Sequence, residues 1–86
     1  MKCFRVVMHG ITREPTDADP DGAGFYTARS MEAESEQHAV ESALRSVRSN
    51  PEAGDIVRLL VDEVCEILPS EVQAHGFIFY DGREDS

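Results

Sequence analysis

The residues whose spacing best suits chemistry form a short acidic run. Asp17, Asp19 and Asp21 alternate and precede Gly22, which matches the first half of a calcium loop of the form D-x-D-x-D-G. Carboxylates on alternate residues converge on a hard cation when a glycine permits the sharp turn. The twelfth position of such a loop requires a glutamate, but this chain has Ala28 there. The run is therefore either a calcium site or an exposed turn rich in aspartate.

Histidines and cysteines are the other candidate bases, ligands and nucleophiles. His9, His38 and His75 are not spaced four residues apart and adjoin no cysteine or carboxylate motif, so they predict no metal site. Cys3 and Cys65 lack C-x-x-C spacing and lie in apolar stretches, which favours two buried free thiols over a disulfide. The sequence also lacks the motifs of phosphate-binding loops, serine hydrolases and zinc proteases. We predict no catalytic residue and no cofactor.

A third group of candidates suits an interface rather than a reaction. Tyr26 and Arg29 lie close together in an aromatic stretch, and both residue types are enriched where proteins bind one another. The alternative is that Tyr26 packs within a sheet and Arg29 neutralises a neighbouring glutamate. Val7 joins the interface candidates because the alternation of its strand points it away from the core.

The length of 86 residues limits the chain to one domain with one core. Its 41% of apolar side chains is an ordinary share, so the chain is expected to fold. We expect a single domain over residues 1–82 and a disordered tail over residues 83–86.

The charge of the chain restricts its partners. The 17 acidic and 8 basic residues give a formal net charge of −9. Nucleic acids and anionic membranes are both bound through clustered lysine and arginine, so neither is an expected partner. No apolar stretch approaches the roughly 20 residues that cross a bilayer, and Arg5 interrupts any signal-peptide core. We expect a cytoplasmic protein whose acidic surface suits a basic protein partner.

Two strands are predicted in the first third of the chain. Residues 3–12 alternate, and one face of this strand carries Phe4, Val6 and Met8 toward the core. Residues 13–24 hold prolines, glycines and acids and predict an exposed loop. Residues 24–31 resume aromatic and β-type residues, so the two strands form a wide hairpin.

A helix and two further strands follow. Apolar residues at helical spacing predict a helix over residues 35–49 with Ser35 as its N-cap. Residues 56–68 fit either a helical stripe or a strand, and their isoleucine and valine content favours a strand over residues 58–67. Residues 76–80 predict a short aromatic strand. The fold class is α+β, a β-β-α-β-β order with a four-stranded, mainly antiparallel sheet and one helix on one face.

One helix covers only one face of such a sheet. The other face would carry Val7 with either Tyr26 and Ala28 or Phe25 and Met31, depending on the register. A face this apolar is expected to be covered by a second copy of the chain. The sequence therefore predicts a homodimer.

Three short motifs resemble a family of small bacterial proteins of uncharacterised function. They are the strand Gly-Phe-Tyr-Thr-x-Arg at residues 24–29, the following Glu/Ala-rich helix, and the strand Gly-Phe-x-Phe-Tyr at residues 76–80. The resemblance covers about residues 24–80. It implies a bacterial origin and a strand over residues 58–67, and it implies no activity and no functional residue.

Three functions of different classes fit these features. The first is a non-enzymatic homodimeric binding or assembly module with an acidic surface. The second is a small enzyme or enzyme subunit whose site is completed across a dimer interface by His9, His75 and Cys3, since both histidines border predicted strands. The third is a domain stabilised by calcium through the loop from Asp17 to Asp21.

Overall fold

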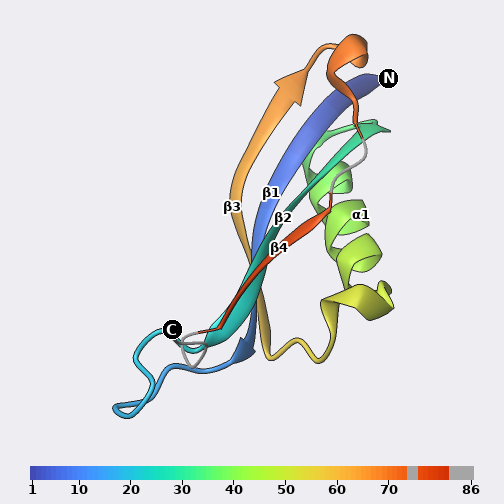
Figure 1. Ribbon diagram of the computed structural model, residues 1–86. Coiled ribbons are helices and arrows are strands. Elements are labelled where there is room, and N and C mark those ends of the chain that lie inside the picture. Colours follow the sequence, from blue (N-terminus) through green and yellow to red (C-terminus); the bar gives the residue numbers. More distant parts are fainter. Residues whose placement is uncertain (74–75, 82–86) are drawn as a thin grey trace.

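The computed structural model describes residues 1–73 and 76–81, and it forms a four-stranded antiparallel sheet with one helix against one face (Figure 1). The element order is β-β-α-β-β, as predicted. Strands follow one another across the sheet in the order β3-β1-β2-β4. Two sequence predictions, for His75 and for the tail over residues 83–86, fall outside the described residues.

A long hairpin of β1 and β2 forms the centre of the sheet. β1 spans Lys2–Arg13 and β2 spans Ala23–Ala33, and they pair without interruption from Lys2↔Ala33 to Ile11↔Gly24. A register shift lies between Ile11 and Arg13, where the chain leaves the hairpin for the acidic loop over residues 14–22. Both predicted strands are confirmed, and both extend one or two residues further than their periodicity indicated.

The helix α1 spans Glu36–Arg48. Ser35 caps its first turn, because the Ser35 Oγ accepts a hydrogen bond from the His38 backbone N–H at 3.1 Å. One face of the helix is formed by Ala39, Ala43 and Val47, and all three side chains are fully buried. Small alanine side chains let the helix lie close to the sheet, which explains why this face packs without large residues.

The remaining strands form the two edges of the sheet. After a short 3-10 turn at Pro51–Ala53, β3 spans Arg58–Ile67 and pairs with β1, so the ambiguous segment is a strand with a bulge opposite Val7 and Met8. A second 3-10 turn at Pro69–Glu71 leads toward β4, which spans Phe77–Asp81 and pairs with β2.

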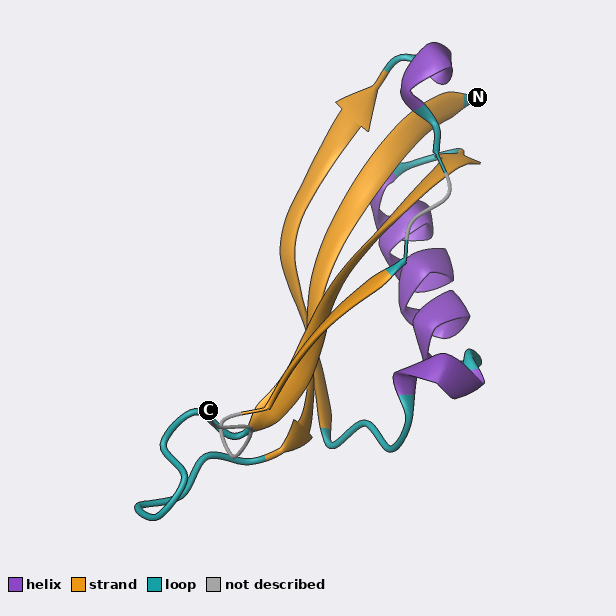
Figure 2. Ribbon diagram, viewed as in Figure 1, coloured by secondary structure: helices purple, strands orange, loops and turns teal. Residues whose placement is uncertain are grey.

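The core lies between the helix and one face of the sheet (Figure 2). The predicted inward face of β1 is confirmed, because Phe4, Val6 and Met8 are at most 4% exposed. Phe25 of β2 is fully buried beside them. A side chain on Gly10 would overlap the Phe25 ring, so the glycine makes room for that ring to cross β1.

The helix leaves most of the second face and the end near β4 uncovered. The molecule measures 47 × 22 × 21 Å, and its radius of gyration of 14.2 Å exceeds the roughly 12 Å of a compact domain this long. Leu60, Tyr26 and Ile78 remain 42%, 46% and 72% exposed. We call the face opposite α1 the open face. Its exposed apolar residues set the location of the candidate site.

Candidate functional site

The register of the strands fixes which side chains share the open face. Residues paired across neighbouring strands point to the same face. Leu60, His9, Tyr26 and Ile78 therefore form one row across all four strands. Val7 and Ala28 form part of the next row. Of the two registers that the sequence left open for β2, the structure places Tyr26 and Ala28 on the open face.

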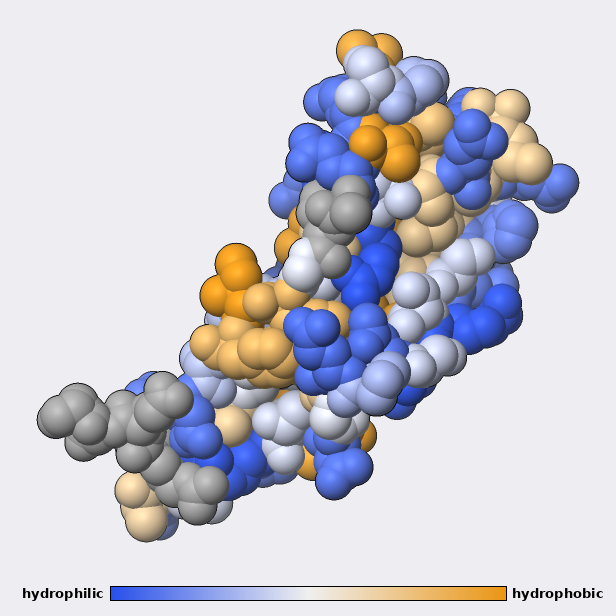
Figure 3. All heavy atoms as spheres, turned by 45° about the vertical axis from the view of Figure 1, so that its right-hand side comes forward, coloured by the Kyte–Doolittle hydropathy of each residue, from blue (hydrophilic) through white to orange (hydrophobic). Residues whose placement is uncertain are grey.

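We call Val7, Tyr26, Ala28, Leu60 and Ile78 the apolar patch. Part of it surrounds a cavity of about 310 Å³. The residues that line this cavity are Val7, Tyr26, Thr27, Ala28, Gly76 and Ile78. Figure 3 shows hydrophobic side chains gathered on the surface between the two grey segments, where β4 runs. The edge strand thus brings its apolar residues to the surface.

A second cavity, of about 480 Å³, lies beside the patch toward the acidic loop. We call it the aromatic hollow, and it is lined by His9, Pro20, Asp21, Tyr26, Tyr80 and Asp81. Three aromatic rings from three strands build it. The His9 and Tyr26 rings are stacked with centroids 4.5 Å apart, and the Tyr26 and Tyr80 centroids are 5.6 Å apart.

Tyr80 is held in the hollow by its hydroxyl group and by a glycine. The hydroxyl oxygen is hydrogen-bonded to His9 Nε2 at 2.6 Å. A side chain on Gly24 would lie 2.9 Å from that oxygen and would overlap the Gly10 carbonyl, so only glycine admits the phenol here. Burial raises the pKa of Tyr80, and the charges of Tyr26 and Asp21 raise it further. A neutral phenol therefore faces the hollow.

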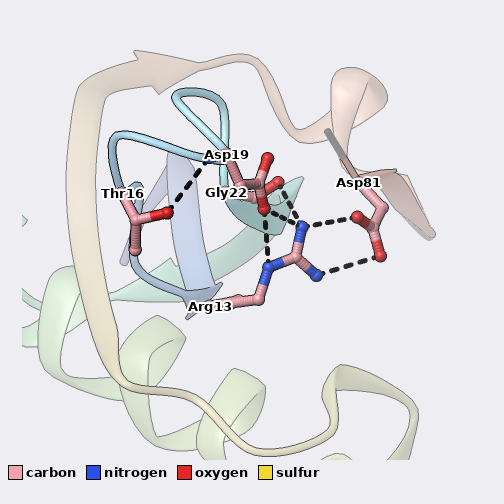
Figure 4. A network of polar contacts seen from close by, with 5 residues as sticks. All are labelled: Arg13, Thr16, Asp19, Gly22 and Asp81. Carbon is pink, nitrogen blue, oxygen red and sulfur yellow. Dashed lines mark hydrogen bonds and ion pairs between the residues drawn. The ribbon is translucent and has the colours of Figure 1, made fainter. Parts of the chain in front are cut away.

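An arginine holds the acidic loop against the end of β4 (Figure 4). The Arg13 Nε donates to Asp19 Oδ2 at 2.8 Å, and its Nη2 donates to Asp81 Oδ1 at 2.6 Å and to the Gly22 carbonyl at 3.2 Å. Hydrogen bonds to Asp81 and Asp19 raise the pKa of Arg13, so this cation persists at every accessible pH. The network fixes the loop that carries Asp21 over the hollow.

The three aspartates of the D-x-D-x-D-G run have different surroundings. Asp19 binds Arg13, Asp21 lines the aromatic hollow, and Asp17 is exposed. In residues 1–73 and 76–81, no three histidine, cysteine or acidic side chains gather where they would hold a metal ion. The calcium site remains a sequence prediction.

The structure separates Arg29 from the other two interface candidates. Arg29 pairs with buried Val6, so it lies on the helix side of the sheet, opposite Val7 and Tyr26. Its guanidinium carbon lies 5.1 Å from the centroid of the Phe77 ring, and its Nη1 donates to Thr27 Oγ1 at 2.9 Å. Arg29 thus packs over the edge of the core, while Val7 and Tyr26 belong to the apolar patch.

The cysteines and histidines do not converge in the part of the chain that the structure describes. Cys3 is a buried free thiol, as predicted, whereas the free thiol of Cys65 is only half-buried. Cys3 lies six residues from His9 along β1, roughly 20 Å in an extended strand. His38 is exposed on the first turn of α1.

The hollow and the apolar patch include residues to which the sequence interpretation assigns no such role. Tyr80 of the hollow and Ile78 of the patch belong to a predicted strand without a function, and Asp21 is predicted only as a metal ligand. Alternation within β4 is the signal that separates Ile78 and Tyr80 from Phe77 and Phe79. It does not reveal that β4 pairs with β2, so it could not bring Tyr80 to His9.

Comparisons with known proteins identified no relative of this chain. None of the helices in the described residues is both long and apolar enough to cross a membrane. The resemblance to a family of small bacterial proteins stays a prediction. No family model, curated protein or solved structure matches the chain.

Proposed function

We propose that the protein is a non-enzymatic assembly module that forms a homodimer through the apolar patch of its open face. The observation that carries this proposal is the row of Leu60, His9, Tyr26 and Ile78 on a sheet face that the helix does not cover, because its three hydrophobic members are each more than 40% exposed. Contiguous exposed apolar surface on a small soluble domain marks an interaction site.

A second copy is the occupant best suited to this face. Two packed sheets lie about 10 Å apart with the side chains of their inner faces interdigitated, and the patch offers one aromatic and four aliphatic side chains for such a contact. A two-fold interface uses the same patch twice, so it requires no other complementary surface. Each partner buries roughly 800 Å² in a standard interface, so the contact would extend from the five patch residues over more of the open face.

The charged side chains of the protein lie outside the five residues of the apolar patch. The five patch residues carry no charge near neutral pH, whereas the whole chain has a net charge of −9. His9 and Glu63 belong to the same two rows of the open face, so these two ionisable groups lie next to the proposed contact. The acidic remainder would keep the dimer soluble and steer basic protein partners toward it. The free thiols of Cys3 and Cys65 agree with a reducing compartment such as the cytoplasm.

Substitution of Ile78 tests the proposal. Ile78→Asp places a charge in the patch, so we expect the dimer dissociation constant to rise roughly tenfold or more. The matched control is Val57→Asp, which changes an apolar side chain that is 55% exposed just before β3 and outside the patch. Light scattering over a dilution series measures both dissociation constants. Equal weakening by both variants, or a wild-type monomer at every concentration, would contradict the proposal.

A further inference from the structure

We propose that the aromatic hollow binds the guanidinium group of an arginine side chain presented by a partner polypeptide. The hollow lies beside the apolar patch and shares only Tyr26 with it. The proposal does not rest on self-association, because the hollow extends beyond the patch to Asp21, Tyr80 and Asp81 at the end of the sheet.

The lining of the hollow combines the two groups that recognise an organic cation. Tyr26 and Tyr80 offer aromatic rings, and tyrosine rings attract guanidinium groups within about 6 Å of the centroid. Asp21 supplies a carboxylate at the rim, and its charge is felt by the phenol of Tyr80. A planar guanidinium stacks on an aromatic ring and donates to a carboxylate at the same time, which a compact ammonium does less well.

Asp21 is the carboxylate with capacity for a new partner. Asp19 and Asp81 both bind Arg13, while Asp21 makes no hydrogen bond or ion pair with the rest of the described chain. The same Arg13 network binds the carbonyl group of the next residue, Gly22, so the backbone beside Asp21 is anchored where Asp21 lines the hollow.

The size of the cavity and the negative charge of the protein both suit an arginine side chain that belongs to a polypeptide. The cavity of about 480 Å³ is lined by the end of β4 and by the acidic loop, and a guanidinium on a flexible stem can enter it while the backbone of the partner stays outside. The net charge of −9 attracts basic segments over a distance of about one Debye length, near 8 Å at physiological salt.

Binding of an arginine peptide to the hollow can be measured by tyrosine fluorescence. The chain contains no tryptophan, and both of its tyrosines line the hollow. The probe is the peptide acetyl-Gly-Arg-Gly-amide at physiological salt, and the control peptide replaces arginine with citrulline, a neutral analogue of the same shape. We expect a saturable change of fluorescence with the arginine peptide and none with the citrulline peptide.

Two matched variants assign the effect to the hollow. Asp21→Asn is expected to weaken arginine binding roughly three- to fivefold, as for a partly exposed ion pair. Asp17→Asn removes the same charge from the same loop, outside the hollow, and is expected to leave the affinity unchanged. Equal binding of the citrulline peptide, or equal weakening by both variants, would overturn the proposal. Neither result would bear on the dimer, whose mass is measured separately.

Discussion

The position of Tyr80 in the hollow raises the pKa of its phenol, which can be measured. Its hydroxyl group is bound to His9, and its ring occupies the space that Gly24 leaves open. Burial is the main reason that its pKa is raised above the ordinary value of 10.0. The phenolate is therefore less stable in the folded protein than in the unfolded chain.

This difference predicts a loss of stability in alkali. The unfolded chain releases the Tyr80 proton near pH 10, while the folded protein keeps it to higher pH. Because the unfolded state then binds fewer protons, the free energy of unfolding falls as pH rises above 10. Urea unfolding between pH 7 and 11 measures this slope, and Tyr80→Phe is expected to reduce it.

The same variant at pH 7 serves as the control. The phenol is then neutral in both states, so Tyr80→Phe loses only the hydrogen bond to His9, about 1 kcal/mol. An alkaline slope that is identical in the wild type and in the variant would show that Tyr80 ionises normally.

Arg29 shows how a rule of alternation could have improved the sequence interpretation. Residues three apart on a strand point to opposite faces, so the predicted strand over residues 24–31 already places Tyr26 and Arg29 on different faces. The structure separates them in this way. The contacts of Arg29 with Phe77 could not be predicted, because they depend on which strand lies next to β2.

At the scale of elements, the crossing of Phe25 over β1 depends on Gly10. A methyl group at Gly10 would overlap a ring that is fully buried and cannot move aside. We expect Gly10→Ala to lower the free energy of unfolding by about 1–3 kcal/mol, the usual cost of overpacking a core. Gly76→Ala is the matched control, because nothing lies within 4 Å of an added side chain there.

Urea unfolding of both variants measures these effects. A Gly10→Ala protein as stable as the Gly76→Ala protein would mean that the Phe25 ring is not confined against β1. Such a result would also question the register that places these two residues opposite each other.

The acidic loop gives a further expectation at this scale. Arg13 Nε and Nη2 already bind the carboxylate of Asp19, so this carboxylate would have to leave Arg13 to coordinate calcium. We therefore expect calcium to leave the melting temperature unchanged. Scanning calorimetry with calcium, and with magnesium as the control, measures it. A rise with calcium alone would restore the calcium site as the explanation of the alternating aspartates.

The elements could largely be predicted because their periods are local properties of the chain. The helix with its Ser35 cap follows from spacing, and the structure confirms it. The spacing of residues 56–68 fits a helix or a strand, and the structure confirms the strand over residues 58–67 that their isoleucine and valine content favours. The hollow could not be predicted, because His9, Tyr26 and Tyr80 come from three strands whose order is set by long-range packing. Spacing along the chain contains no record of that order.

The whole molecule is elongated, and its helix covers only one of the two faces of the sheet. A short chain buries a smaller share of its surface than a long one, and this sheet has apolar residues on both faces with a helix on only one. Association is a common way for a small domain to complete its burial. The central claim is that the open face of one copy covers the open face of another.

The most direct test is an isotope-filtered nuclear Overhauser experiment on an equal mixture of labelled and unlabelled protein. The dimer predicts contacts between chains from the methyl groups of Val7, Ala28 and Ile78. Methyl groups that show contacts only within their own chain, at concentrations of hundreds of micromolar, would contradict the claim.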